Sequence, residues 1–133
     1  MIRVDLARIV LNETDERQII VLKERDGQRS FPIVIGIREA QAIHRGIHGL
    51  KHERPLTHDL ILDVLEKLDA KVDRVVVNDL RDGTFYARIV LVRNGETIDI
   101  DSRPSDAVAI AVQRETPIFV EEKVFEEACN FDV

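Results

Sequence analysis

Two short segments place an Arg-Pro pair, a hydroxyl-bearing residue and an aspartate close together and in the same order. The first is Arg54-Pro55-Leu56-Thr57-His58-Asp59 and the second is Arg103-Pro104-Ser105-Asp106. In each segment the residues after the proline open a run of apolar residues that is typical of a helix. The aspartates therefore fall in a first helical turn, where unpaired N–H groups and a partial positive charge favour carboxylates and bound anions.

These two helix starts have a structural and a chemical interpretation. In the structural one, Thr57 and Ser105 cap the helices, and Asp59 and Asp106 stabilise them by roughly 0.3–1 kcal/mol each. In the chemical one, the two starts converge, and the two aspartates together with Asp101 hold a divalent cation such as Mg²⁺ or Mn²⁺, because hard cations prefer carboxylate oxygens. No organic cofactor is expected on either interpretation.

A second acidic group precedes the later helix start. Asp99 and Asp101 alternate with isoleucines, so both carboxylates project from one face of a strand, roughly 6.5 Å apart at the backbone. With Arg103 and Asp106 close behind, they form an acidic cluster that contains one guanidinium. A metal ion held there would polarise a phosphodiester and activate water, while Arg103 neutralises the phosphate. The alternative is a half-exposed strand with solvated aspartates.

His58 is the histidine best placed for chemistry. A helix N-terminus disfavours the imidazolium form, and a neutral imidazole can accept a proton from water or bind a metal ion. The alternative is a structural histidine that is hydrogen-bonded or packed against Pro55.

The other histidines and the single cysteine are less informative. His44, His48 and His52 are spaced by four residues, and the first two would share one face of a helix, as a zinc-binding pair does. Arg45 follows His44 where the zinc-protease pattern has glutamate, so we interpret these histidines as a solvated polar face. Cys129 has no obvious activating partner, and one cysteine excludes an intrachain disulfide.

Local patterns predict the elements that position these residues. Alternating apolar residues predict strands over 2–11, 17–24, 31–35, 72–80, 84–92, 96–101 and 118–120. Helical spacing predicts helices over 37–47, 58–68, 104–114 and 121–128. Hairpins followed by helices favour an α+β fold with a mostly antiparallel sheet and three or four helices. The order strand–turn–strand–helix occurs twice, which is weak support for an internal duplication.

Length and composition limit the function. The chain has 133 residues, which predicts one domain over residues 1–133. Its longest apolar runs are far shorter than the ~20 residues of a membrane span, so we expect a soluble, cytoplasmic protein without a membrane partner. The formal net charge is −6, and residues 94–133 hold 3 Lys and Arg against 10 Asp and Glu. Such a chain is a poor non-specific binder of nucleic acid, which would instead be a substrate held at a local site.

Several segments carry a resemblance when they are taken in order and with their spacing: Phe31-Pro32-Ile33-Val34-Ile35-Gly36 with Glu39-Ala40, Arg54-Pro55-Leu56-Thr57-His58-Asp59-Leu60, Thr84-Phe85-Tyr86-Ala87, Ile100-Asp101-Ser102-Arg103-Pro104-Ser105-Asp106-Ala107 and Pro117-Ile118-Phe119-Val120. Together they resemble the bifunctional nuclease domain family over roughly residues 2–128. The resemblance implies a small α+β domain that forms a homo-oligomer, in a family whose plant members are described as degrading RNA and DNA. The family's matching positions here are Glu39, Arg54, Thr57, His58, Asp59, Asp101, Ser102, Arg103, Ser105 and Asp106.

Two functions stay open, and we favour the first. The first is metal-dependent hydrolysis of phosphodiester bonds in RNA or DNA, with His58 as general base or water-orienting residue. In that function the catalytic residues are His58, Asp59, Asp101 and Asp106, the metal ligands are the three aspartates, and the substrate-binding residues are Arg54, Thr57, Arg103 and Ser105. The second is a non-catalytic oligomeric module that binds a ligand or partner. There Arg54 and Arg103 would pair with Asp59 and Asp106 and fix the helices to the sheet.

Overall fold

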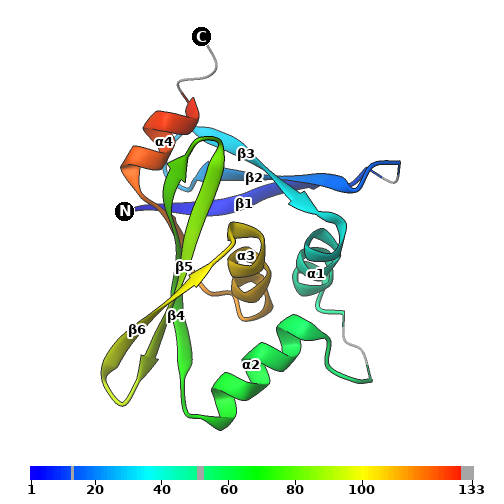
Figure 1. The fold of residues 1–133 in the computed structure, drawn as a ribbon, viewed down its shortest axis with the longest axis vertical. Coiled ribbons are helices and arrows are strands. Elements are labelled where there is room, and N and C mark those ends of the chain that lie inside the picture. Colours follow the sequence, from blue (N-terminus) through cyan, green and yellow to red (C-terminus); the bar gives the residue numbers. More distant parts are fainter. Residues whose placement is uncertain (13, 51–52, 130–133) are drawn as a thin grey trace.

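A seven-stranded sheet and four helices make up the computed structural model, which describes residues 1–12, 14–50 and 53–129 (Figure 1). The strands are β1 (Ile2–Val10), β2 (Arg17–Glu24), β3 (Ser30–Gly36), β4 (Lys71–Arg81), β5 (Thr84–Arg93), β6 (Glu96–Ser102) and β7 (Ile118–Val120). The helices are α1 (Ile37–His48), α2 (Thr57–Lys67), α3 (Pro104–Gln113) and α4 (Glu122–Cys129). The predicted α+β class is confirmed, and every predicted element is present within a few residues. None of these helices has the length and hydrophobicity needed to cross a membrane.

Two antiparallel meanders form the sheet, whose strand order is β3-β2-β1-β7-β4-β5-β6. The short strand β7 joins them, antiparallel to β1 and parallel to β4. One helix follows each meander, α1 after β3 and α3 after β6, so the strand–helix repeat expected from the sequence is present. Asp82-Gly83 and Asn94-Gly95 close two-residue hairpins with positive φ at both positions, which suits the twist of the flanking strands.

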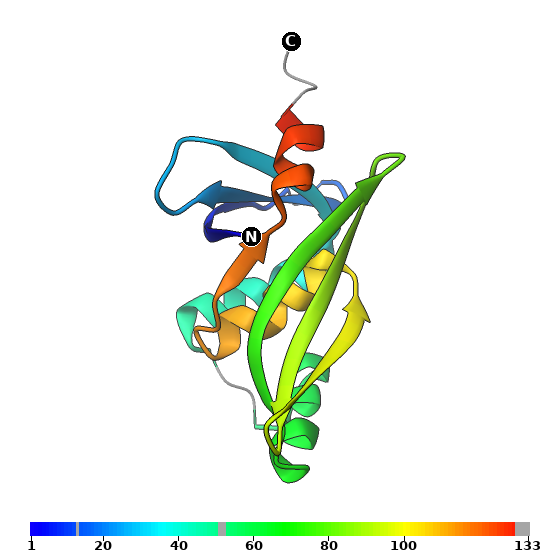
Figure 2. The same cartoon turned by 90° about the vertical axis from the view of Figure 1, so that its left-hand side faces the viewer.

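The sheet is strongly twisted and curled (Figure 2), so that its edge strand β3 approaches β5 near the other edge. Phe31 on the edge strand β3 stacks on Phe85 of β5, with ring centroids 5.4 Å apart, although four strands separate β3 from β5. Phe125 of α4 meets the Phe31 ring edge-on, with centroids 5.1 Å apart, and covers this seam. The right-handed twist of consecutive strands accumulates into this curvature.

Helices α1 and α3 pack closely inside the curl. Every residue of α3 from Pro104 to Ala111 except Asp106 is buried, and three of these are alanines, which allow close approach. On α1, a Cβ atom added to Gly46 would lie 2.8 Å from Cγ2 of Val112. The two helices therefore meet with almost no space between them. This close packing fixes the position of the start of one helix relative to the start of the other.

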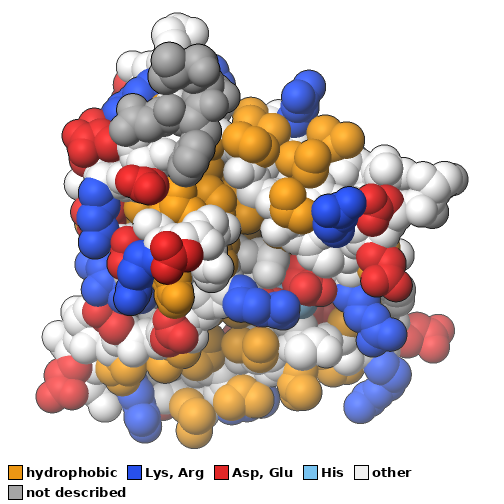
Figure 3. Space-filling view, turned by 45° about the horizontal axis from the view of Figure 1, so that its top comes forward, with side chains coloured by type: hydrophobic (Ala, Val, Ile, Leu, Met, Phe, Trp, Pro, Cys, Tyr) orange, Lys and Arg blue, Asp and Glu red, His pale blue; other side chains and the backbone are white. Residues whose placement is uncertain are grey.

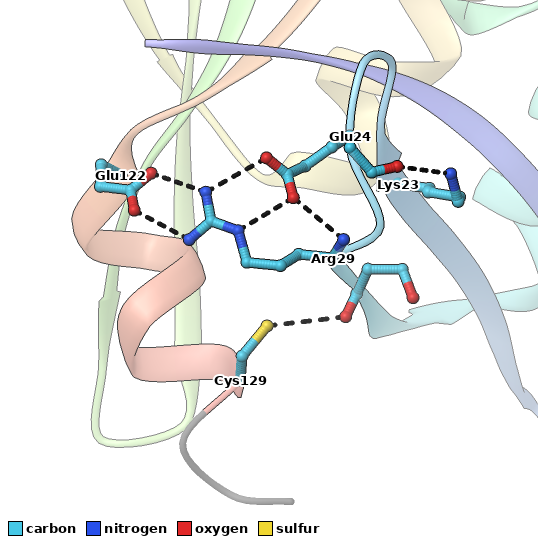
Figure 4. A network of polar contacts seen from close by, with 7 residues as sticks. Lys23, Glu24, Arg29, Glu122 and Cys129 are labelled. Atoms are coloured by element: carbon cyan, nitrogen blue, oxygen red, sulfur yellow. Dashed lines mark hydrogen bonds and ion pairs between the residues drawn. The ribbon is translucent and has the colours of Figure 1, made fainter.

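Arg29 holds α4 against the β2–β3 hairpin (Figure 4). Its Nη1 and Nη2 each donate to a carboxylate oxygen of Glu122 at 2.8 Å, and its Nε donates to Oε1 of Glu24 at 2.9 Å. The guanidinium also lies 4.6 Å from the centroid of the Phe125 ring. These hydrogen bonds lower the pKa of Glu24 and of Glu122 below its usual value, because they favour the ionised carboxylates.

We expect Arg29→Gln to make the free energy of unfolding less dependent on acid pH. A carboxylate whose pKa is lowered in the folded state stabilises the protein above its unfolded pKa, here 4.5, and loses that stabilisation as the pH falls through the folded value. Urea unfolding between pH 3 and pH 7 measures this. Arg29→Gln should be less stable than the wild type at pH 7, and the difference should shrink toward pH 3.

Arg114→Gln is the matched control for this prediction. Arg114 lies 3.7 Å from Glu66, and both side chains are more than half exposed, so this pair contributes little. A stability difference between wild type and Arg29→Gln that stays constant from pH 7 to pH 3 would contradict the assignment.

Candidate functional site

The starts of α2 and α3 meet, as expected from the two Arg-Pro segments. Nε2 of His58, in the first turn of α2, lies 2.9 Å from Oδ1 of Asp106, in the first turn of α3. The His58 side chain is 12% exposed and the Asp106 side chain 29% exposed. An ionised carboxylate only accepts hydrogen bonds, so the arrangement has His58 Nε2–H donating to Asp106. The imidazole is thus held in place by a carboxylate while its edge still reaches solvent.

Arg103 links this pair to α1. Its Nε and Nη2 lie 3.1 Å and 2.9 Å from Oδ2 of Asp106, and Nη2 also lies 3.4 Å from Oε1 of Glu39. Glu39 is in the first turn of α1, so the contacts His58–Asp106–Arg103–Glu39 join the starts of three helices. Glu39 was identified from the family pattern alone, since its place in a first turn carries no other signal.

An open groove of about 580 Å³ runs beside this network. One wall is β3 from Pro32 to Gly36, another is the β4–β5 turn with Phe85, and the starts of α1 and α3 contribute Glu39, Arg103, Pro104 and Ser105. The Arg103 side chain is 69% exposed, and Arg17, at the start of β2, lines the same groove. Sequence reasoning missed Arg17 because only the curl of the sheet brings it opposite α3. Ser105, predicted to bind substrate, does line the groove.

The helix starts are not capped as predicted. Helix α2 begins at Thr57 after Leu56, and α3 begins at Pro104 after Arg103, so Thr57 and Ser105 lie inside the helices and are not the capping residues. Because leucine has no polar side chain to cap a helix, Oδ2 of Asp59 accepts the backbone N–H of Leu56 at 3.0 Å instead. This supports the structural interpretation, in which Asp59 stabilises the start of α2, although Asp59 does so by accepting the N–H of Leu56 and not beside a Thr57 cap.

The expected cluster of Asp59, Asp101 and Asp106 does not form. In β6, Ile100 pairs with Ile89 of the hydrophobic core, so Asp101 lies on the opposite face of the sheet, in register with Arg88. There Arg88 Nη1 lies 3.2 Å from Oδ2 of Asp99. Within residues 1–12, 14–50 and 53–129, no three His, Cys, Asp or Glu side chains are grouped to hold a metal ion. This donor set therefore does not fit a Mg²⁺ or Mn²⁺ ion held by the protein alone.

The remaining predicted residues lie outside the network. Arg54 is exposed ahead of α2, and in the part of the chain that the structure describes it forms no ion pair with Asp59. His44 and His48 share an exposed face of α1, with ring centroids 4.4 Å apart, and His52 lies outside the described residues. Cys129 is half-buried at the end of α4, where its Sγ lies 3.7 Å from the carbonyl oxygen of Ser30 (Figure 4).

The histidine–carboxylate pair of His58 and Asp106 is thus joined through Arg103 to an open groove on a curled α+β fold. The family model of the bifunctional nuclease domain matches residues 20–131. The chain belongs to this family, and the resemblance drawn from its motifs is confirmed.

Relatives fall into two groups. An uncharacterized protein of Mycobacterium tuberculosis is 42% identical over 120 residues, which cover 90% of this chain and 71% of that protein. Bifunctional nuclease 2 of Arabidopsis thaliana is 30% identical over 105 residues, and bifunctional nuclease 1 of Oryza sativa subsp. japonica is 26% identical over 118 residues. The matches cover 76% and 86% of this chain but only 32% and 36% of the two plant proteins.

We expect Asp59→Ala to lower the free energy of unfolding by about 1 kcal/mol, the usual cost of a lost helix cap, and Asp59→Asn to lower it less because the amide oxygen still accepts a hydrogen bond. Urea unfolding measures both. Glu66→Ala on the same helix is the control and should change stability by less than about 0.5 kcal/mol. An Asp59→Ala variant no less stable than Glu66→Ala would show that the bond to Leu56 is not what Asp59 contributes.

Proposed function

We propose that this chain hydrolyses phosphodiester bonds of RNA or DNA in the groove beside Arg103. Family membership supports a nucleic-acid substrate, since relatives carry the name bifunctional nuclease. The observation that carries the proposal is the His58–Asp106 contact of 2.9 Å, which is linked to that groove through the ion pair of Asp106 with Arg103. It joins two motifs 48 residues apart, and a histidine hydrogen-bonded to a carboxylate is an arrangement suited to general-base catalysis.

His58 acts as the general base. With Nε2–H donated to Asp106, the lone pair of Nδ1 is free to take a proton from water, and the carboxylate stabilises the imidazolium that results. The water oxygen forms a bond to phosphorus as the bond from phosphorus to the leaving oxygen breaks. The leaving oxygen is protonated from solvent, and His58 returns its extra proton to solvent.

Arg103 contacts the phosphate. Its guanidinium is exposed toward the groove, and its longest contact is the 3.4 Å approach to Glu39, so a phosphate can replace Glu39 while the bonds to Asp106 stay. Arg17 supplies a second guanidinium to the groove. Two arginines are a small cationic surface for a chain of net charge −6, which favours a short single-stranded segment over a long duplex contact.

The groove fits that substrate in size. Its volume of about 580 Å³ lies in the usual range of small-molecule sites, so it accepts one or two nucleotides. Val34 and Phe85 give it an apolar surface on which a base can rest, and the two arginines bind the phosphates. No step of this scheme is assigned to a metal ion, because the described donors do not converge on one.

We expect purified protein to cleave single-stranded RNA or DNA, with His58→Ala and Asp106→Asn each lowering kcat by about 10²–10⁴, the usual contribution of general-base catalysis. Arg103→Gln should raise KM more than it lowers kcat. Asp59→Asn and Asp101→Asn are matched carboxylate controls that should keep activity, since neither side chain lies in the network. A gel assay with labelled single-stranded and duplex substrates, run in Mg²⁺, in Mn²⁺ and in EDTA, measures all of these and shows whether a metal is required.

Two results would count against this proposal. One is a wild-type protein that cleaves none of the substrates under any of the three conditions. The other is cleavage at the wild-type rate by both His58→Ala and Asp106→Asn.

A binding module without catalysis is the second candidate, and the observation that favours it is the Arg103–Asp106 ion pair. In that case the pair fixes α3 to α1 and α2, and the groove binds a phosphate-bearing ligand without cleaving it. His58→Ala and Asp106→Asn would then lower thermal stability, and labelled oligonucleotides would bind but remain intact.

A further inference from the structure

Helix α2 is apolar on two sides. Toward the core it buries Leu62 and half-buries Leu65. On its outer side Leu60, Ile61, Val64 and Leu68, which we call the α2 stripe, are 38–53% exposed. Figure 3 shows apolar side chains gathered along the lower edge of the molecule, where α2 lies in Figure 1.

The α2 stripe is continuous. Leu60, Val64 and Leu68 follow one another at intervals of four residues and so lie along one side of the helix, with Ile61 beside them. Scattered exposed apolar residues are ordinary on a monomer, but a contiguous row marks an interaction site. Polar side chains bound this row on one side only, at Asp63 and Lys67, while on the other side the apolar surface runs into the core.

We propose that the α2 stripe is where two copies of this chain associate, with the two α2 helices antiparallel and Val64 at the centre. A two-fold axis places the same surface on both copies, so a patch that uses it must complement itself. Centred on Val64, Leu60 of one copy faces Leu68 of the other. The same axis brings together the two flanks that carry Asp63 and Lys67.

Charge complementarity selects this arrangement. In the antiparallel pair, Lys67 of each copy lies about one helical turn or less from Asp63 of the other, so the two-fold axis creates two opposite-charge contacts. In a parallel pair the two-fold axis runs along the helices, so the flank that carries Asp63 and Lys67 would instead face the opposite, apolar flank of the other copy and neither charge would be paired. The sequence of the flank therefore favours a second copy in one orientation.

Strand β6 also carries exposed apolar residues, but two of the registers in which it could pair with itself are unfavourable. Ile98 and Ile100 are exposed on the sheet face that carries the helices, at the open edge of the sheet. Pairing β6 with β6 of a second copy, centred on Asp99 or Ile100, would set carboxylates of the two copies directly opposite each other. These two registers of β6 are therefore disfavoured, whereas the antiparallel α2 pair brings opposite charges together.

Sedimentation equilibrium of the wild type and of Val64→Lys over a range of concentrations tests the surface. The wild type should associate, and Val64→Lys should weaken association by about tenfold or more, because it places a charge at the centre of the apolar contact. Val10→Lys, which changes the same residue type at an exposed position on β1, is the matched control and should associate like the wild type. Circular dichroism of Val64→Lys should match the wild type, since the side chain is half exposed.

Charge reversal tests the orientation. Asp63→Lys and Lys67→Glu should each weaken association, because each sets like charges across the axis. A mixture of these two variants should form a one-to-one heterodimer, in which both flank positions of one copy are basic and both flank positions of the other are acidic. If the two substitutions acted only by changing the stability of their own helix, mixing the two variants would not restore association.

Three results would overturn the proposal: a wild type that is monomeric at every concentration, an unchanged mass for Val64→Lys, or a mixture of the two charge variants that associates no better than either alone. None of these measurements depends on cleavage, so the interface and the proposed function fail or stand separately.

Discussion

The close packing of α1 against α3 decides where the candidate site lies. Gly46 leaves no room between α1 and Val112, and the alanine-rich α3 is buried along most of its length. With the two helix axes fixed against each other, Glu39 and Arg103 at their starts come within 3.4 Å. Asp106 then lies where α2 can bring His58 to it. The site is thus a consequence of helix packing, and its polar contacts follow from where three helices begin.

The sheet adds the second half of the site. Its curl brings the edge strand β3 to β5, and the stacked rings of Phe31 and Phe85 hold these two strands together. This closure creates the groove, because β3 and the β4–β5 turn become its walls. Phe85 therefore has two roles, one in the seam and one in the lining of the groove. The network of α1, α2 and α3 without the curl would be an open surface with no place for a ligand.

Local signals were sufficient to predict the elements but not all the contacts between them. Alternation, the turns at Asp82-Gly83 and Asn94-Gly95, and the two Arg-Pro segments locate strands and helices within a few residues. The hypothesis that the two Arg-Pro helix starts converge came from their shared signal, and the starts do meet, but in the described part of the chain the contact is between His58 and Asp106 and not between aspartates around a cation. Arg17 could not be predicted, since its place in the groove depends on sheet curvature, which no short segment encodes. Which residue caps α2 was missed because a leucine precedes the helix, so the cap had to come from Asp59.

The error about Asp101 has a different cause. The strand period placed Asp99 and Asp101 on one face correctly, but it could not say which face of the sheet the helices cover. Pairing of Ile100 with the core residue Ile89 settles that question and places both carboxylates opposite the helices. Nearness in sequence to Asp106 was therefore misleading, because Arg103 and Pro104 turn the chain from one side of the sheet into α3. Asp101 and Asp106 are only five residues apart in the sequence, but the sheet lies between their side chains.

Helix α2 has fewer buried residues to hold it in place than α3, although both helices contribute to the site. Within the described chain it buries only Leu62 fully, whereas α3 buries seven of its residues. Yet α2 carries His58, and an imidazole must be held to within a fraction of an ångström of its working position to act as a base. A helix with one buried anchor and an exposed apolar side gains rigidity from whatever covers that side. The surface that invites association and the residue that needs positioning are thus parts of the same short helix, so an assembly formed there would steady the histidine without touching it.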